Sequence, residues 1–134
     1  MESPRTLSGH ETVLLVEDEP ALRTLTKHIL SSHGYLVLEA ANGMDALQLI
    51  EGSHIHLDLL LTDVVMPGMS GVELAGQISR VFPGIRIAFM SGHADMPKAG
   101  DGKTCVIQKP VAPDALLLQL RTILETQSSG HYAA

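Results

Sequence analysis

The chain has 134 residues, an apolar fraction of 45% and a net charge of −6 with its seven histidines counted as neutral. This length predicts one domain that can bury its own core, and the negative charge argues against direct binding to nucleic acid. A single cysteine, Cys105, excludes an internal disulfide framework. No apolar run is long enough for a membrane span, and residues 1–11 lack a signal-peptide core, so we expect a cytoplasmic protein without membrane insertion.

Short apolar runs alternate with segments of helical periodicity along the chain. In order, we predict a strand at 12–17, a helix at 19–33, a strand at 35–40, a short helix up to about residue 51, a strand at 57–62, a helix at 70–82, strands at 85–90 and 104–108, and a last helix from Pro113. Residues 1–11 are expected to form a disordered N-terminal segment, 12–126 the folded domain, and 127–134 a C-terminal tail or linker.

Strands that alternate with helices predict an α/β fold, in which helices cover both faces of a parallel sheet. One connection departs from this pattern. A helix is expected between the fourth and fifth strands, but Pro97, Gly100 and Gly102 fall in that segment. Interior proline costs a helix about 3 kcal/mol and interior glycine about 1 kcal/mol. We therefore predict that the fourth helix, within residues 92–103, is short or missing.

Polar groups follow four of the predicted strands, namely Glu17-Asp18, Asp63, Ser91 and Lys109. Because the carboxyl ends of parallel strands share one edge of the sheet, these groups can converge there. Crowded carboxylates repel one another unless a cation is present, and their oxygens suit a hard ion such as Mg²⁺. A carboxylate beside a divalent cation and a lysine can accept a phosphoryl group, and a nearby hydroxyl can then bind the new phosphoryl oxygens.

The chain resembles the receiver domains of two-component response regulators. The resemblance extends over residues 12–125 and depends on four motifs in the expected order and spacing. They are Leu15-Val16-Glu17-Asp18-Glu19-Pro20, the segment from Leu61 to Gly71 (LTDVVMPGMSG), Met90-Ser91-Gly92 and Gln108-Lys109-Pro110. Any one motif alone is weakly specific, whereas the set is highly specific.

This resemblance implies a flavodoxin-like, doubly wound, five-stranded parallel sheet of strand order 2-1-3-4-5. It also implies that Asp63 is the phosphoacceptor. Mg²⁺ is expected to bind the carboxylates of Asp18 and Asp63 and the backbone carbonyl of Val65, with Glu17 acting through a water molecule.

The remaining motif residues are expected to bind the phosphoryl group or to respond to it. Lys109 pairs with Asp63 or with its phosphoryl group, and Ser91 is the switch hydroxyl. Gly92 leaves room for phosphate to approach the backbone. The bond between Lys109 and Pro110 is expected to be cis, a form that costs an X-Pro bond only about 0.5–1 kcal/mol.

Two features depart from the family pattern. Val106 stands where the family often has an aromatic switch residue, and the shortened segment 92–103 removes most of a helix that the family uses for output and dimerisation. His93, two residues after Ser91, is either a tuner of dephosphorylation or a solvated loop residue.

The expected partner is a sensor histidine kinase or a histidine phosphotransfer domain, whose phosphohistidine donates to Asp63. The sequence around Ser91 and Lys109 resembles that of receivers attached to hybrid histidine kinases. A covalently linked kinase module is therefore one expectation, and a stand-alone receiver is the other. Two alternatives remain. The chain could be an unphosphorylated pseudo-receiver that serves as a protein-interaction module. An aspartyl-phosphate phosphatase would need a second acid two residues after Asp63, where the chain has Val65.

Overall fold

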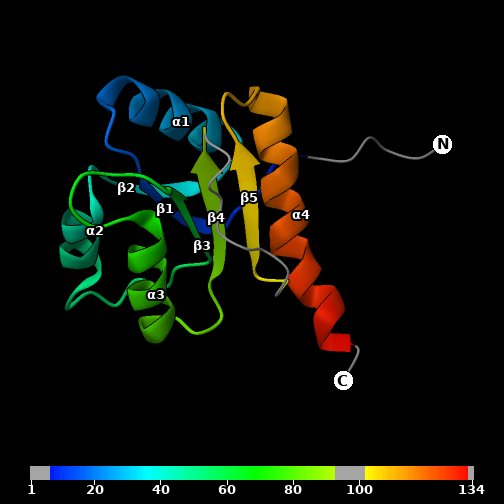
Figure 1. The fold of residues 1–134 in the computed structure, drawn as a ribbon. Coiled ribbons are helices and arrows are strands. Elements are labelled where there is room, and N and C mark those ends of the chain that lie inside the picture. Colours follow the sequence, from blue (N-terminus) through cyan, green and yellow to red (C-terminus); the bar gives the residue numbers. More distant parts are fainter. Residues whose placement is uncertain (1–6, 93–101, 133–134) are drawn as a thin grey trace.

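The computed structural model describes residues 7–92 and 102–132 (Figure 1). Nine elements follow one another in these ranges: β1 (Thr12–Val16), α1 (Pro20–Ser32), β2 (Leu36–Ala40), α2 (Gly43–Ile50), β3 (Leu59–Asp63), α3 (Gly71–Val81), β4 (Arg86–Ser91), β5 (Thr104–Gln108) and α4 (Pro113–Tyr132). No helix in the described ranges is both long enough and apolar enough to cross a bilayer.

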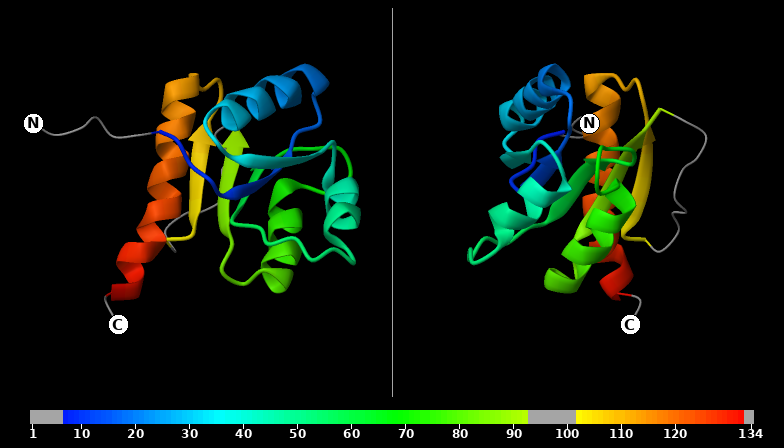
Figure 2. Two further views of the ribbon diagram at one scale, coloured as in Figure 1. Left: turned by 180° about the vertical axis from the view of Figure 1, so that it is seen from behind. Right: turned by 60° about the vertical axis from the view of Figure 1, so that its left-hand side comes forward.

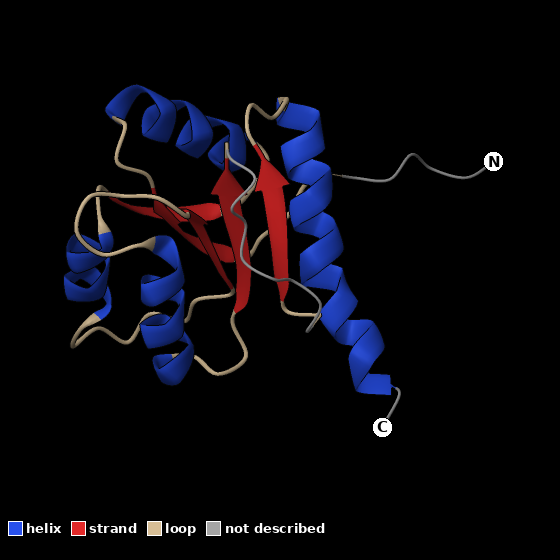
Figure 3. Ribbon diagram, viewed as in Figure 1, coloured by secondary structure: helices blue, strands red, loops and turns tan. Residues whose placement is uncertain are grey.

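The five strands form one parallel sheet in the order β2-β1-β3-β4-β5, as predicted. Helices α1 and α4 cover one face, and α2 and α3 cover the other (Figures 2 and 3). The interior strands β1 and β3 are buried on both faces, which explains why their sequences are nearly continuous apolar runs. Alternate residues of β1 enter different cores, since Leu14 packs with α2 and α3 whereas Leu15 packs with α1 and α4.

Helix starts follow the local sequence signals. Ser70 and Glu73 form a complete capping box at α3, in which the Glu73 backbone N–H donates to Ser70 Oγ at 3.1 Å and the Ser70 N–H donates to Glu73 Oε1 at 3.0 Å. At α2, the Asn42 side chain accepts a hydrogen bond from the Asp45 backbone N–H at 2.8 Å. These caps fix where the two helices leave the carboxyl edge of the sheet.

The chain ends differ from the prediction where the structure describes them. Residues 7–11 pack on the fold instead of being disordered: the Gly9 N–H donates to the His33 carbonyl at 2.9 Å, and Leu7 packs against the core beneath α1 and α4. Helix α4 continues to Tyr132, through most of the stretch predicted to be a tail. Once a helix is docked, adding residues to its end costs little, and no proline interrupts it. The predicted loss of the fourth helix falls mostly on residues 93–101, outside the described residues.

Candidate functional site

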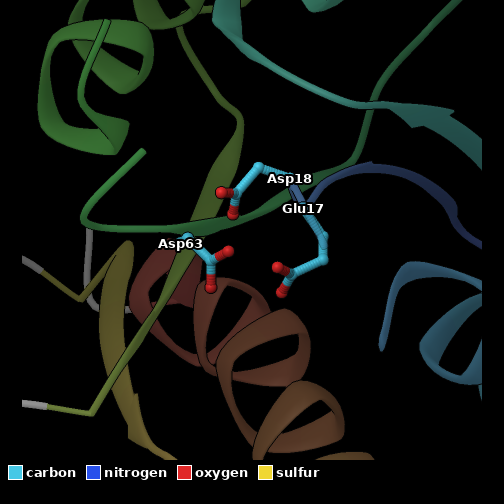
Figure 4. A group of neighbouring side chains, drawn as sticks. All are labelled: Glu17, Asp18 and Asp63. Atoms are coloured by element: carbon cyan, nitrogen blue, oxygen red, sulfur yellow. The ribbon is translucent and has the colours of Figure 1, made fainter. Parts of the chain in front are cut away.

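Three carboxylates converge at the carboxyl edge of the sheet. Asp63 is the last residue of β3, while Glu17 and Asp18 directly follow β1. One carboxylate oxygen from each lies within 4.8 Å of the others, and Figure 4 shows the three side chains turned toward a common space. Glu17 and Asp63 are almost fully buried, at 1% and 3% exposure, whereas Asp18 is exposed. The sequence prediction that these residues meet is therefore confirmed.

Lys109 places a positively charged side chain at this site. It follows β5, and its backbone N–H donates to the Ser91 carbonyl at 2.9 Å, which ties it to the end of β4. Its Nζ forms an ion pair with Asp63 Oδ1 and lies 3.4 Å from Glu17 Oε1. The following bond to Pro110 is cis, in agreement with the prediction. One ammonium thus faces two buried carboxylates.

The buried carboxylates are not fully compensated by this lysine. Burial raises the pKa of Asp63, the neighbouring Glu17 carboxylate raises it further, and Lys109 lowers it only in part, so that it reaches about 7. Burial lowers the pKa of Lys109, but its pairing with Asp63 and Glu17 outweighs this and leaves that pKa raised. The site therefore retains excess negative charge, which a bound cation would neutralise.

An open pocket of about 350 Å³ lies over these groups. Its lining includes Ser91, Gly92 and Val65 beside the acidic residues and Lys109. Ser91 is buried at the end of β4, and Val65 is exposed in the loop after β3. A Cβ built on Gly92 would meet no atom within 4 Å, so the packing of the described residues does not itself require glycine there. All the predicted phosphoryl-binding residues that the structure describes line this one pocket.

The donor set fits a hard divalent cation. Magnesium favours one or two carboxylates with other oxygen ligands, and Asp18 and Asp63 offer such carboxylates beside an accessible pocket. The Val65 residue also borders that space. The second buried acid, Glu17, is already held: its Oε2 accepts a hydrogen bond from the Glu19 N–H at 3.1 Å, and its Oε1 faces Lys109. This arrangement agrees with an indirect role for Glu17.

Two of the residues that shape the site were not singled out from the sequence. Gly71 begins α3, and a Cβ there would lie 1.9 Å from the Asp63 carbonyl oxygen, so glycine is required for α3 to start against the end of β3. Its position in the motif after Asp63 was the available signal. Arg23 on α1 donates a hydrogen bond from Nη1 to the Glu17 carbonyl at 2.7 Å. No local pattern predicts that contact.

The region of the expected aromatic switch is occupied by a small side chain. Val106 pairs in register with Phe89 on β4, is half-buried, and packs against the core beneath α2 and α3. A valine has no ring to rotate between a buried and an exposed position. His93, the other residue named near the switch, lies outside the described residues.

The sequence of the chain matches the family model described as "Response regulator receiver domain" over residues 13–121. The chain belongs to this family. The receiver fold and its acidic edge, described above from the coordinates, are thus those of a signalling module of two-component systems.

Known relatives of this receiver include both kinases and phosphotransfer proteins. It is 38% identical over 131 residues to the sensor kinase CckA of Brucella abortus (strain 2308), covering 95% of this chain and 14% of that protein. It is 29% identical over 94 residues to sporulation initiation phosphotransferase F of Bacillus subtilis (strain 168), covering 70% of this chain and 74% of that protein.

Solved structures of receivers share the fold. The receiver domain of the hybrid histidine kinase CckA superposes with a TM-score of 0.74 at 32% identity, covering 84% of this chain and 98% of that one. A CheY-like receiver domain protein from Methanospirillum hungatei JF-1 superposes with a TM-score of 0.75 at 28% identity, covering 91% and 99%. The chain spans only 14%, 50% and 26% of the length of three curated relatives that it matches, namely CckA, YbdJ of Bacillus subtilis and GlrR of Escherichia coli.

Proposed function

We propose that this receiver accepts a phosphoryl group on Asp63 from the phosphohistidine of a sensor histidine kinase or of a histidine phosphotransfer domain. The observation that carries the proposal is the buried Asp63 carboxylate, held by Lys109 in a pocket whose other walls are Glu17, Asp18 and Ser91. Membership of the receiver family supports it. The surroundings match what an aspartyl nucleophile needs: access, a cation partner and a nearby hydroxyl donor.

The transfer step forms one bond and breaks one. An Asp63 carboxylate oxygen attacks phosphorus, while the P–N bond to the donor imidazole breaks and its electron pair goes to the ring nitrogen. Lys109 Nζ, already at Asp63 Oδ1, stabilises the negative oxygens of the group being transferred. The Ser91 hydroxyl, on the rim of the same pocket, then donates to a phosphoryl oxygen of the acyl phosphate.

Mg²⁺ is the proposed cofactor. Asp18, Asp63 and the Val65 carbonyl would hold it, and Glu17 would contact it through water. When bound, it neutralises charge on the carboxylates and the phosphoryl oxygens. The Asp63 pKa of about 7 has a direct consequence here. Because the nucleophile and ligand must be the carboxylate, cation binding releases a proton and is favoured by rising pH.

The proposed outcome is a conformational switch that controls a partner or a covalently linked kinase module in the cytoplasm. The similarity to the CckA receiver supports the linked-kinase arrangement. In this chain the switch would act without a rotating aromatic, since Val106 fills that place. The chain itself would be a signalling phosphoacceptor that assists its own phosphorylation and dephosphorylation.

Acetyl phosphate and Mg²⁺ test the proposal directly. We expect intact-mass measurement to show one added phosphoryl group on the wild type, none on Asp63→Asn, and a wild-type amount on Asp114→Asn, which removes an exposed carboxylate from the first turn of α4. EDTA should abolish the adduct. Absence of an Asp63-dependent adduct would instead indicate a pseudo-receiver. Asp63-dependent turnover of a generic phosphoester would indicate a phosphatase.

A further inference from the structure

Arg23 joins the acidic loop after β1 to the edge strand β2. Its Nη1 donates to the Glu17 backbone carbonyl at 2.7 Å, and its Nε lies 3.4 Å from Glu39 Oε1. The arginine stands on α1, six residues after Glu17, so one side chain reaches back over the start of its own helix. The planar guanidinium can make both contacts at once, which the point charge of a lysine cannot reproduce.

The carbonyl that Arg23 binds lies where the sheet ends. The β1–β2 register finishes at Val16 opposite Ala40, and the Glu17 N–H still donates to the Ala40 carbonyl at 3.1 Å. The Glu17 carbonyl is the next acceptor along, and Arg23 supplies its donor. Backbone acceptors in partly buried places need such partners. This hydrogen bond fixes the plane of the peptide that joins Glu17 to Asp18, the two acids that face Asp63.

Arg23 is itself held in place from β2. Glu39 pairs with Lys27 at 2.8 Å as well as with Arg23, and the hydrogen bond from Lys27, together with the charge of both cations, lowers the pKa of Glu39. The Arg23 side chain is 20% exposed and lines a polar groove between α1 and α2 with Glu39. Substitutions at these positions therefore change the network without opening the core.

We propose that Arg23 is a positioning residue for the cation site: by holding the Glu17–Asp18 peptide, it aims both carboxylates at the space beside Asp63. This inference rests on the proposed function, in which that space binds Mg²⁺. The change in Mg²⁺ affinity expected on loss of Arg23 has the opposite sign to that of a simple charge effect. Removing a positive charge near a cation site would strengthen cation binding by Coulomb's law, whereas loss of a positioning contact weakens it.

The experiment compares three variants with the wild type by calorimetric titration of the metal-free protein with Mg²⁺ alone. Arg23→Gln removes the charge and the bridging fork, and we expect Mg²⁺ affinity to fall about tenfold, at the lower end of effects seen for groups that orient metal ligands. Arg23→Lys keeps the charge but not the fork, and should fall between the two. Lys27→Gln is the matched control, because it removes a cation from the same Glu39 network, and its affinity should stay within about twofold of wild type.

A second readout needs no metal. Amide NMR shifts of Asp18 and Glu19 in the metal-free protein should move in Arg23→Gln and stay in place in Lys27→Gln. Wild-type or tighter Mg²⁺ binding by Arg23→Gln would overturn the positioning role while leaving the proposed function intact. A wild type that binds no Mg²⁺ would overturn the proposed function and the inference with it. Equal losses in Arg23→Gln and Lys27→Gln would also overturn the inference, because they would trace the effect to the shared Glu39 network or to stability and not to the Glu17 contact.

Discussion

Two clusters of charged residues, each with buried members, lie at opposite ends of the strands, and they differ in how their charges are compensated. The acceptor cluster (Glu17, Asp18, Asp63 and Lys109) lies at the carboxyl ends. The anchor cluster (Glu11, Tyr35, Arg121 and Glu125) lies near the amino ends, where Arg121 and Glu125 of α4 meet residues that precede β1 and β2. In the anchor cluster, Arg121 donates to Glu11 Oε1 at 2.8 Å, Tyr35 Oη at 3.2 Å and Glu125 Oε2 at 3.1 Å.

The pKa shifts of one carboxyl group from each cluster, Glu11 and Asp63, run in opposite directions. Burial raises the pKa of Glu11, but the Arg121 hydrogen bond and backbone donors outweigh it, so this pKa is lowered. For Asp63, burial and Glu17 prevail over Lys109, and the pKa is raised to about 7. The ionised form of Glu11 in the anchor cluster is thus stabilised by its neighbours. The ionised form of Asp63 in the acceptor cluster is destabilised in the absence of a bound cation. Local frustration of this kind is expected at functional sites.

The largest expected effect on stability comes from breaking the anchor cluster. Arg121→Met should lower the free energy of unfolding by about 2–4 kcal/mol, because it leaves the half-buried Glu11 and the buried Tyr35 without their shared donor. Urea denaturation measures the change. Arg80→Met, which removes an exposed arginine from the last turn of α3, is the control and should change stability by less than about 0.5 kcal/mol. Equal losses in both variants would show that the anchor cluster has no special role.

Packing at the acceptor cluster can be tested with two glycines of α3. Gly71→Ala places a Cβ against the Asp63 carbonyl, so we expect a loss of about 1–3 kcal/mol and a slower uptake of the phosphoryl group from acetyl phosphate. Gly76→Ala, in the same helix, meets no atom within 4 Å and should gain about 0.5–1 kcal/mol from helix propensity. Thermal unfolding and intact mass together check this pair. Similar shifts of the same sign would contradict the proposed close packing of α3 on β3.

Neutralising the acceptor should stabilise the metal-free protein. A group whose pKa rises from 3.8 to about 7 on folding contributes stability that is fully present below pH 3.8 and lost as pH rises through 7. In EDTA at pH 8, Asp63→Asn should therefore unfold with a free energy about 1–2 kcal/mol higher than wild type. The difference should shrink as pH falls toward 4.

We expect Mg²⁺ to reverse the order of stability of the wild type and Asp63→Asn. Saturating Mg²⁺ should stabilise the wild type through binding to its folded state and leave Asp63→Asn nearly unchanged. The Asp114→Asn control should follow the wild type under both conditions. An Asp63→Asn variant that is less stable than wild type in EDTA at pH 8 would show that the acceptor cluster is compensated like the anchor cluster.

The smallest expected effect is the pH response of the anchor cluster. A lowered pKa of Glu11 contributes stability that is present above its ordinary value of 4.5 and lost as pH falls through the folded value. Glu11→Gln should cost about 0.5–1 kcal/mol at pH 7, and less as the solution becomes acidic. The slope has the opposite sign to that of Asp63. Urea denaturation across pH 3–8 gives the difference in unfolding free energy between each variant and the wild type. The contrast would be disproved if this difference changed with pH in the same direction for Glu11→Gln and for Asp63→Asn.

Much of the fold and the acceptor cluster could be predicted because they depend on local pattern. Apolar runs specify β1 and β3, the Ser70–Glu73 box specifies the start of α3, and parallel topology forces the strand ends to one edge. That is why Asp63 and Lys109, which are distant in sequence, could be expected at the same edge of the sheet, and the family resemblance added the expectation that they pair. The motifs also identified Val106 as the residue at the place of the family's aromatic, and the structure pairs it with Phe89 of β4.

The features that the sequence did not predict depend on how the helices and strands pack against one another. Arg121 and Glu11 are 110 residues apart, and only the docking of α4 beside the start of β1 brings them together. The ordering of residues 7–11 follows from that contact and from the Gly9 hydrogen bond to His33, which a polar N-terminal sequence does not indicate. Helix α4 continues past its last apolar stripe for a similar reason, since its docked part has already formed the helix that its end extends.

The sequence by itself therefore determined the alternation of strands and helices and the identity of the groups at the strand ends, because backbone periodicity and capping are properties of neighbouring residues. Only the tertiary structure decided the pKa values of those groups, the contacts that position them and how far their charges are compensated. The direction of the Asp63 pKa depends on burial and on the distances to Glu17 and Lys109. The reach of Arg23 to the Glu17 carbonyl depends on the packing of α1 beside β2. Electrostatic energies change with separation and burial, and those quantities exist only once the chain has folded.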